Sequence, residues 1–324
     1  MITQNKNLFS PEQEALLTRL DSRVAAGTSL LRLHLETGIR QDQLAALIQR
    51  EPSSRFGWEP SLFETLAQWL DATPAAHELP TTRADTPSFK TISSLLGMAH
   101  QSRSLIAITG PVGFGKSFAA TCYAAQNPRS HRKPGAVRIQ FNKTDNKPSA
   151  ALAAILAGLH GESVGSYRNG NLYQAVGTKL RPGDFLILDE CQRLETAVDI
   201  VASLHDDFGV GIAMIGNPDF SNAIWGKDRT FDALGSRILR HDFTHSTGED
   251  IETWLAWKGV LEGLSVKDRA ALVKTAVTIG TRPGREGGLR TLSQIMDYAE
   301  RAYGNQPMNG PLLSVLVKQL KEGV

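Results

Sequence analysis

Residues 104–117 read Ser-Leu-Ile-Ala-Ile-Thr-Gly-Pro-Val-Gly-Phe-Gly-Lys-Ser, and this stretch decides the fold. Its first half is an apolar run of strand-forming residues, and its second half fits the phosphate-loop pattern G-x-x-x-x-G-K-[ST]. Residues suited to a helix follow the loop directly. A strand before the loop and a helix after it form the context that makes this pattern specific. The sequence therefore predicts a phosphate-binding loop at the carboxyl end of a buried strand.

Each residue type in this loop suits the binding of a nucleoside triphosphate. The glycines allow backbone N–H groups to point inward around phosphate oxygens, and the start of the following helix adds a partial positive charge. Lys116 carries the cation for the β- and γ-phosphates, and Ser117 offers a hydroxyl to Mg²⁺. The nucleotide-binding residues predicted from the loop are Gly110, Pro111, Val112, Gly113, Phe114, Gly115, Lys116 and Ser117.

Two carboxylates follow the apolar strand of residues 185–188, about 70 residues after the loop. Asp189 is predicted to bind Mg²⁺ together with Ser117, and Glu190 to polarise the attacking water. A further apolar strand, residues 211–215, leads to Asn217, whose amide suits the orientation of that water. An asparagine before proline is also common in simple turns, so both interpretations of Asn217 stand.

Two arginines complete the predicted catalytic set. Arg237 follows Asn217 by some twenty residues, and Arg290 opens a C-terminal helix after two glycines. A planar guanidinium group suits bidentate contact with phosphate. Solvated surface arginine is the alternative for each of them.

Alternation of short apolar strands with helices from residue 104 onward predicts the α/β class, with a parallel sheet sandwiched by helices. Expected strands span 105–109, 136–141, 185–189, 211–215 and 240–243. Helical periodicity dominates both flanks, and residues 72–87 are rich in proline, threonine and alanine, which is typical of a linker. We predict a helical module over 1–72, a linker over 73–89, an ATPase core over 90–248 and a helical lid over 249–324.

Composition excludes several classes of protein. The chain has 324 residues, of which 41% are hydrophobic and 21% charged, so it is neither disordered nor a disulfide-stapled miniprotein. Its two cysteines are expected to be small buried residues. No run of 18 apolar residues occurs, and the N-terminus lacks the apolar segment of a signal peptide, so we expect no membrane partner and a cytoplasmic location.

The charge is unevenly distributed along the chain. Residues 91–185 carry 11 basic and 3 acidic residues, a net charge of +8, whereas the segments on either side are mildly acidic. Such a band predicts contact with a polyanion. Lys143, Lys147 and Arg168 lie in loops of this band and are expected to contact the phosphates of double-stranded DNA without reading its sequence; simple solvation is the alternative.

The N-terminal module has the spacing of a helix-turn-helix around its turn residue Gly38. His34 departs from the pattern, since a small residue usually lets the two helices approach. Arg40, Arg50 and several glutamines of the second helix could contact DNA. Residues 1–90 are net acidic, however, so a protein-docking module is an equally good interpretation.

These motifs in this order resemble those of the AAA+ ATPases. Residues 110–117 are similar to Walker A, residues 185–190 to Walker B, Asn217 to sensor 1, Arg237 to an arginine finger and Arg290 to sensor 2. This resemblance implies ATP and Mg²⁺ as cofactors, with an arginine finger that acts on a neighbouring subunit.

Within that class the layout of residues 90–303, preceded by a helix-turn-helix-like module, resembles the phage Mu transposition protein B (MuB) family and its TniB and TnsC transposon relatives. This resemblance implies a DNA-binding ATPase that assembles into a ring or helical filament on DNA, selects target DNA and stimulates a transposase. Two alternatives stay open: a replication initiator or helicase loader, and a helix-turn-helix regulator with an ATP switch.

Overall fold

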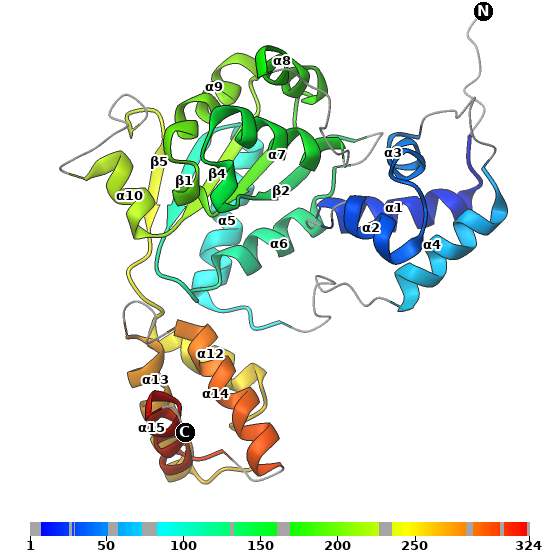
Figure 1. Ribbon diagram of the computed structural model, residues 1–324. Helices are drawn as coiled ribbons and strands as arrows, with labels where there is room; N and C mark the ends of the chain where they lie inside the picture. Colours follow the sequence, from blue (N-terminus) through cyan, green and yellow to red (C-terminus); the bar gives the residue numbers. More distant parts are fainter. Residues whose placement is uncertain are drawn as a thin grey trace, which may run out of the picture.

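The structure, a computed structural model, shows three parts that follow one another along the chain (Figure 1). A helical module comes first, a sheet with helices on both faces follows, and a second group of helices ends the chain. The first module lies beside the sheet domain, and the last group of helices lies below it in Figure 1. The described residues are 8–25, 28, 30–50, 58–72, 83–129, 133–160, 169–226, 235–282, 288–304 and 308–322.

The core is built on a sheet that has five parallel strands in the described residues. The strands are β1 (Leu105–Thr109), β2 (Ala136–Gln140), β3 (Phe185–Asp189), β4 (Gly211–Gly216) and β5 (Leu239–Asp242). Their order is β2-β3-β4-β1-β5. The pairing sets Thr109, the last residue of β1, beside Gly216 and Asp242. Because parallel strands end at the same edge of a sheet, the residues that follow β1, β3 and β4 meet there.

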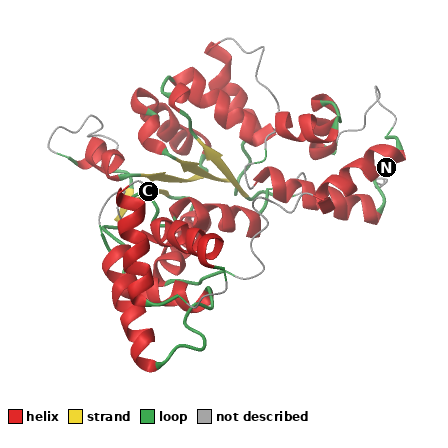
Figure 2. Cartoon of the chain, turned by 60° about the horizontal axis from the view of Figure 1, so that its bottom comes forward, coloured by secondary structure: helices red, strands yellow, loops and turns green. Residues whose placement is uncertain are grey.

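Helices cover both faces of this sheet (Figure 2). The helices are α5 (Pro87–Ser102) and α6 (Lys116–Gln126) on one face, and α7 (Pro148–His160), α8 (Asn169–Lys179), α9 (Val198–Phe208) and α10 (Pro218–Trp225) on the other. Along β1, Ile106 and Ile108 pack toward α5 and α6, whereas Leu105 and Ala107 pack toward the other face. This two-sided burial explains why the strands read as continuous apolar runs.

The predicted α/β class and the predicted strands and helices are confirmed, with boundaries that shift by a few residues. Helix α5 begins at Pro87, before the predicted start of the core at residue 90. Thr86 caps this helix, since its hydroxyl accepts a hydrogen bond from the Phe89 N–H at 3.2 Å, and proline suits the first helical position. The helix therefore starts inside the predicted linker, of which residues 73–82 lie outside the described residues.

The two cysteines behave as the composition predicts. Cys122 and Cys191 are free and buried, the first on α6 and the second directly after β3. A membrane-crossing helix is not found in the described segments, where none is both long and apolar enough.

The first helical module has an apolar core of its own. Its helices are α1 (Pro11–Ala25), α2 (Leu30–Thr37), α3 (Gln41–Gln49) and α4 (Pro60–Ala72). Leu20, Leu33, Leu47 and Leu66 are fully buried between them. Helix α1 also packs against α6 and β2, so the module lies against the edge strand of the core (Figure 1).

Arg50 ends α3 and is buried, which corrects its expected place on a DNA-contacting surface. Its guanidinium pairs with Asp21 at 3.0 Å, and the two side chains are only 6% and 1% exposed. The backbone of Arg50 has a left-handed conformation, and its N–H caps the end of α3. Its charge is neutralised inside the module, whereas Arg40 remains on the surface and pairs with Asp42.

The turn between α2 and α3 is formed as expected. Gly38 has a φ of +72°, a left-handed value that glycine adopts without strain. His34, which departs from the small-residue pattern, donates from Nδ1 to the Ile39 carbonyl at 2.9 Å and thereby closes the turn. A role for this turn in DNA binding stays a prediction.

The last group of helices, the lid, forms a separate apolar cluster. It contains α12 (Gly248–Trp257), α13 (Val266–Gly280), α14 (Gly288–Tyr303) and α15 (Gly310–Glu322). Asp250 joins the lid to the core, because its carboxylate accepts hydrogen bonds from the Ser88 N–H at 2.8 Å and the Ser88 hydroxyl at 2.7 Å. The same carboxylate accepts from the Thr247 N–H at 2.8 Å and so caps α12.

Asp250 is fully buried, and burial acts to raise its pKa. The hydrogen bonds from Ser88 and Thr247 outweigh burial and lower the pKa below its ordinary value. A carboxyl group with a lowered pKa stabilises the folded state above its unfolded pKa, and this contribution is lost as the pH falls through its folded pKa.

We predict that Asp250→Asn weakens the joint between lid and core. The free energy of unfolding should fall by about 1.5–3 kcal/mol, the range for hydrogen bonds to a charged group. Denaturant titrations at neutral pH and at successively lower pH should show the difference between the two proteins shrinking in acid. Asp268→Asn is the matched control, because Asp268 caps α13 with Ser265 on the surface. An equal loss of unfolding free energy in both variants would contradict the proposal that Asp250 joins the lid to the core.

Candidate active site

A cavity of about 540 Å³ opens between the core and the lid. It is lined by the phosphate-loop residues 112–117, by the residues that end β3 and β4, and by the first turn of α14. The predicted site residues that it brings together are Val112, Gly113, Phe114, Gly115, Lys116, Ser117, Asp189, Glu190, Asn217 and Arg290. Gly110 and Pro111 touch the site through Lys116, as described below. Its size is ordinary for a small-molecule site.

The phosphate loop has the backbone that its glycines predict. Gly113 and Gly115 have φ values of +82° and +99°, in the left-handed region that favours glycine. A Cβ at Gly110 would lie 3.0 Å from Phe243 Cβ, so a side chain there would push against the end of β5. Phe114 is buried against the ring of Phe243, with the two ring centres 4.6 Å apart. Packing against Phe243 thus fixes one side of the loop, and residues 112–117 of the loop line the cavity.

Lys116 Nζ donates to the carbonyls of Gly110 and Pro111, at 2.7 Å and 2.9 Å. Burial lowers the pKa of this ammonium to about 8, and the nearby Arg290 acts in the same direction, while Asp189 and Glu190 act to raise it. A phosphate would provide a stronger partner than two neutral carbonyls. Lys116 is therefore placed to change partners when a nucleotide binds.

Asp189 and Ser117 both line the cavity. Their oxygens are the ligand type that Mg²⁺ prefers, and this ion commonly uses one or two protein oxygens together with phosphate oxygens and waters. Across the described residues, no three His, Cys, Asp or Glu side chains are close enough to hold a metal ion by themselves. The donor set therefore fits Mg²⁺ bound together with a nucleotide.

Glu190 is positioned by its neighbours on both sides. Its backbone has a φ of +64°, which costs a non-glycine residue about 1–2 kcal/mol and is typical of functional sites. Gln192 Nε2 donates to Glu190 Oε2 at 2.8 Å, and Gln192 Oε1 accepts from the Asn217 N–H at 3.3 Å. Arg193 pairs with the same Glu190 oxygen at 3.2 Å. The sequence analysis missed Gln192 and Arg193, although they follow Glu190 within three residues.

Asn217 lies at the cavity, and its side chain also caps α10. Its Oδ1 accepts from the Phe220 N–H at 3.2 Å, and its Nδ2 donates to Asp219 at 2.9 Å. The asparagine thus caps a helix before Pro218, as the turn interpretation expects, and it also lines the cavity. Its role in orienting a water stays a prediction.

The lid contacts the phosphate loop directly. The backbone N–H of Arg290 donates to the Gly113 carbonyl at 3.3 Å. Gly288 has a φ of +84°, and a Cβ there would lie 3.3 Å from that same carbonyl oxygen. The first turn of α14 is thus seated on the loop, and the Arg290 side chain lines the cavity.

The cavity also has an aromatic lining. It is lined by Phe89 of α5, Phe118 of α6 and two tryptophans of α12, Trp254 and Trp257. Phe118 and Trp257 are 43% and 39% exposed, unusually high for large apolar side chains. These residues come from three separate helices whose apolar faces read as ordinary core, so no local pattern singled them out. An apolar wall beside a phosphate loop suits a flat ring such as a nucleobase.

Arg237 does not line this cavity. Its guanidinium is exposed and pairs with Asp206 of α9. The neighbouring Arg240 pairs with Asp242 and lies over the Trp225 ring, 4.8 Å from its centre.

The basic band is partly neutralised inside the protein. Arg129 pairs with Asp184 at 3.0 Å, and Arg138 pairs with Asp189 at 2.6 Å. Lys143 and Lys147 are exposed in the segment that follows β2, where residues 143–145 form a short 3-10 helix. Arg168, the third predicted DNA contact, lies outside the described residues. The surface charge of the band is therefore smaller than its sequence indicates.

The geometry places a P-loop at the carboxyl edge of a parallel sheet, beside a cavity that the C-terminal helices close. Residues 99–224 match the family model described as "AAA domain". The fold is accordingly that of the AAA+ P-loop nucleoside triphosphatases, with additional helical parts at both ends.

Several solved structures are similar to this chain at low sequence identity. The Aeropyrum pernix ORC2 protein, in its ADPNP–ADP complexes, is 16% identical with a TM-score of 0.50, over 74% of this chain and 69% of that one. Its ADP form is 17% identical with a TM-score of 0.49, over 74% and 70%. The Thermotoga maritima RuvB Holliday junction branch migration motor is 16% identical with a TM-score of 0.43, over 71% and 69%. No curated protein matches the chain.

We predict that the affinity for ADP falls as the pH rises through about 8, the pKa of Lys116 in the nucleotide-free protein. Phosphate raises this pKa, so binding takes up a proton above pH 8, and the affinity should fall by up to about tenfold per pH unit. Calorimetry in buffers of different ionisation heat measures both the affinity and the number of protons taken up on binding. The phosphates of ADP titrate near pH 6, well below this range. Lys116→Arg should remove the dependence, and a pH-independent wild type would contradict the assignment.

Proposed function

We propose that this chain is an ATPase whose cavity between core and lid binds ATP with Mg²⁺ and hydrolyses it. One observation carries the proposal: a P-loop lysine, an acidic pair and a lid arginine from three distant segments line one cavity. Lys116, Asp189, Glu190 and Arg290 are the residue types that phosphoryl transfer requires, namely cations for the phosphates, a metal ligand and a carboxylate for water.

Each of these side chains has a distinct role in the proposed reaction. Lys116 and Arg290 bind the phosphates from the core side and the lid side. Asp189 and Ser117 would hold Mg²⁺, which neutralises charge on the phosphates when bound. Glu190 orients a water through Oε1 or Oε2 and accepts its proton, while Asn217 fixes the direction of attack. The aromatic wall of the cavity takes the base and excludes water there.

We further propose that the protein binds double-stranded DNA and assembles on it in its ATP state. The exposed Lys143 and Lys147 support this, because they follow β2 at the sheet edge where the nucleotide site lies. The order of motifs, with a helical module before the core and a lid after it, favours a role in DNA transposition. In that role the assembly presents target DNA to a transposase.

The test uses Glu190→Gln, which keeps the shape of the side chain but removes its ability to accept a proton. We expect this variant to bind ATP normally, to lose nearly all hydrolysis, and to remain assembled on DNA. Nucleotide binding, phosphate release and electron microscopy with DNA measure the three properties. Wild-type turnover in the variant would refute the role of Glu190.

The same experiment separates the proposed cellular roles. Rings or filaments on DNA of any sequence, together with stimulation of a transposase encoded beside the protein, support the transposition role. Binding to a replicative helicase would favour an initiator or loader. Protection of one operator sequence through residues 30–50 would favour a regulator.

We predict that Lys143→Ala with Lys147→Ala weakens DNA binding equally for all sequences. Removing one lysine–phosphate interaction should flatten the slope of log affinity against log salt by about 0.9 on duplex DNA. Filter binding or fluorescence anisotropy at several salt concentrations measures this slope. Adding Arg168→Ala should flatten it further.

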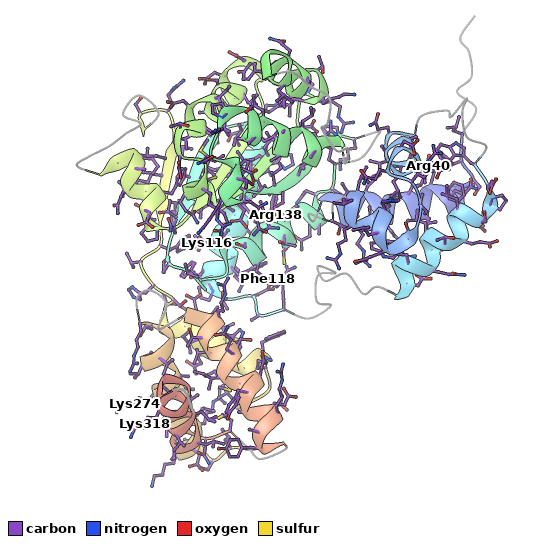
Figure 3. All side chains as sticks on the ribbon, viewed as in Figure 1. Arg40, Lys116, Phe118, Arg138, Lys274 and Lys318 are labelled. Carbon is purple, nitrogen blue, oxygen red and sulfur yellow. The ribbon has the colours of Figure 1, made fainter. Side chains whose placement is uncertain are left out.

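Lys274→Ala with Lys318→Ala is the control, since it removes the same charge from the lid. Figure 3 places both lysines below the core, far from Lys116. A change of slope in the control alone would move the proposed DNA surface to the lid, and no change in either would move it to the N-terminal module.

We propose that Arg237 acts on the ATP site of a neighbouring subunit. Its exposure and its position outside this chain's own cavity support that role. An arginine supplied in this way can raise the rate of hydrolysis by roughly 10³ or more.

Arg237→Ala should therefore bind ATP but hydrolyse it slowly. Mixing it with Lys116→Ala should restore activity, because one subunit supplies the intact pocket and the other the intact arginine. Arg240→Ala is the control, since this arginine is held by Asp242 and Trp225. No gain in a mixture whose subunits co-assemble would rule out action between subunits.

A further inference from the structure

Asp189, the proposed metal ligand, is bound in this structure by a buried arginine that no motif of the sequence singled out. Arg138 Nη2 lies 2.6 Å from Asp189 Oδ2, and the two side chains are only 7% and 2% exposed. The other carboxylate oxygen, Oδ1, accepts from the Glu190 N–H at 3.0 Å. Both oxygens of Asp189 are therefore engaged by donors.

The position of Arg138 follows from strand register. Strand β2 runs beside β3, with Gln140 opposite Asp189 and Arg138 opposite Ile187. Ala136 and Ile187 pack on the face covered by α5 and α6, and alternate residues of a strand share a face. Arg138 thus reaches Asp189 on that face, from within the protein. Figure 3 shows Arg138 in the core near Lys116.

The pair differs from a purely structural ion pair elsewhere on the sheet. Arg129 pairs with Asp184 before β3 begins, and its remaining guanidinium nitrogens donate to the carbonyls of Leu159 and Lys179. Among the described residues, Arg138 has one other hydrogen-bond partner, Gln140 at 3.1 Å, and its buried Nε has none. A buried polar atom of this kind is costly. What distinguishes the Arg138 pair from the Arg129 pair is that its carboxylate, Asp189, also lines the cavity.

We propose that Arg138 is a positioning residue that competes with the divalent cation for Asp189. This inference rests on the proposed function. A guanidinium and a metal ion both need the negative charge of one carboxylate, and a cation so close to a metal ligand disfavours a second cation there. Arg138 holds Asp189 in place when no metal is bound and gives up Oδ2 when the metal binds with nucleotide. It thereby weakens metal binding and makes it depend on the nucleotide phosphates.

The test measures Mn²⁺ affinity directly, by electron paramagnetic resonance of free Mn²⁺ in the presence of saturating ADP. Arg138→Gln should bind Mn²⁺ about tenfold more tightly than the wild type, because the competing charge is gone. Arg138→Lys keeps that charge and should restore the wild-type affinity. Arg129→Gln breaks the other buried pair and should leave Mn²⁺ affinity unchanged.

The outcomes separate this inference from the proposed function. If the wild type binds ADP neither with Mg²⁺ nor in EDTA, the proposed function fails. If ADP binds but Arg138→Gln has the Mn²⁺ affinity of the wild type, or a weaker one, the competition is refuted. Should Arg138→Gln fail to fold, crystal structures of the wild type with ADP decide the question. An Arg138–Asp189 pair that persists with Mg²⁺ in place would overturn the inference, and separation of the pair relative to the EDTA form would support it.

Discussion

Parallel pairing of β4 between β1 and β3 is the constraint on which the site depends. It brings together the ends of three strands that lie far apart in sequence, so the phosphate loop, the acidic pair and Asn217 share one edge. Helices on both faces keep these strands buried, so their end residues have fixed positions. A shift of one residue in this register would turn Asp189 toward the opposite face of the sheet. The positions of the site residues therefore depend on the backbone hydrogen bonds that pair β1, β3 and β4, several residues away from the site.

The lid and the N-terminal module attach to this core in different ways. The lid is held by polar contacts, through Asp250 to Ser88 and through the Arg290 N–H to Gly113. The N-terminal module instead packs α1 against α6 and β2. Strand β2 carries Arg138, and α6 begins with Lys116. The N-terminal module therefore packs against the two elements that supply these cationic side chains.

Local patterns were enough to predict the fold, and they selected residues that the structure brings to one cavity. The phosphate loop and the acidic strand end are each a short contiguous stretch of sequence. The spacing of residues within each stretch is strict enough to identify the motif. Phe118, Trp254 and Arg138 could not be predicted in the same way, because each reaches the site through tertiary packing. Arg50 shows the reverse case: an arginine at the end of an apparent recognition helix is buried against Asp21, a partner 29 residues away. The charge counted over residues 91–185 likewise overstated the basic surface, since Arg138 is neutralised within the fold by Asp189, which lies outside that count.

The two polar attachments of the lid limit how it can move. One lies at the start of α12 and the other at the start of α14, so the lid is fixed at two separate points. A body held at two points turns most easily about the line through them. The expected motion is thus a rotation about that line, which changes the width of the cavity between the core and the lid while the first turn of α14 stays on the phosphate loop.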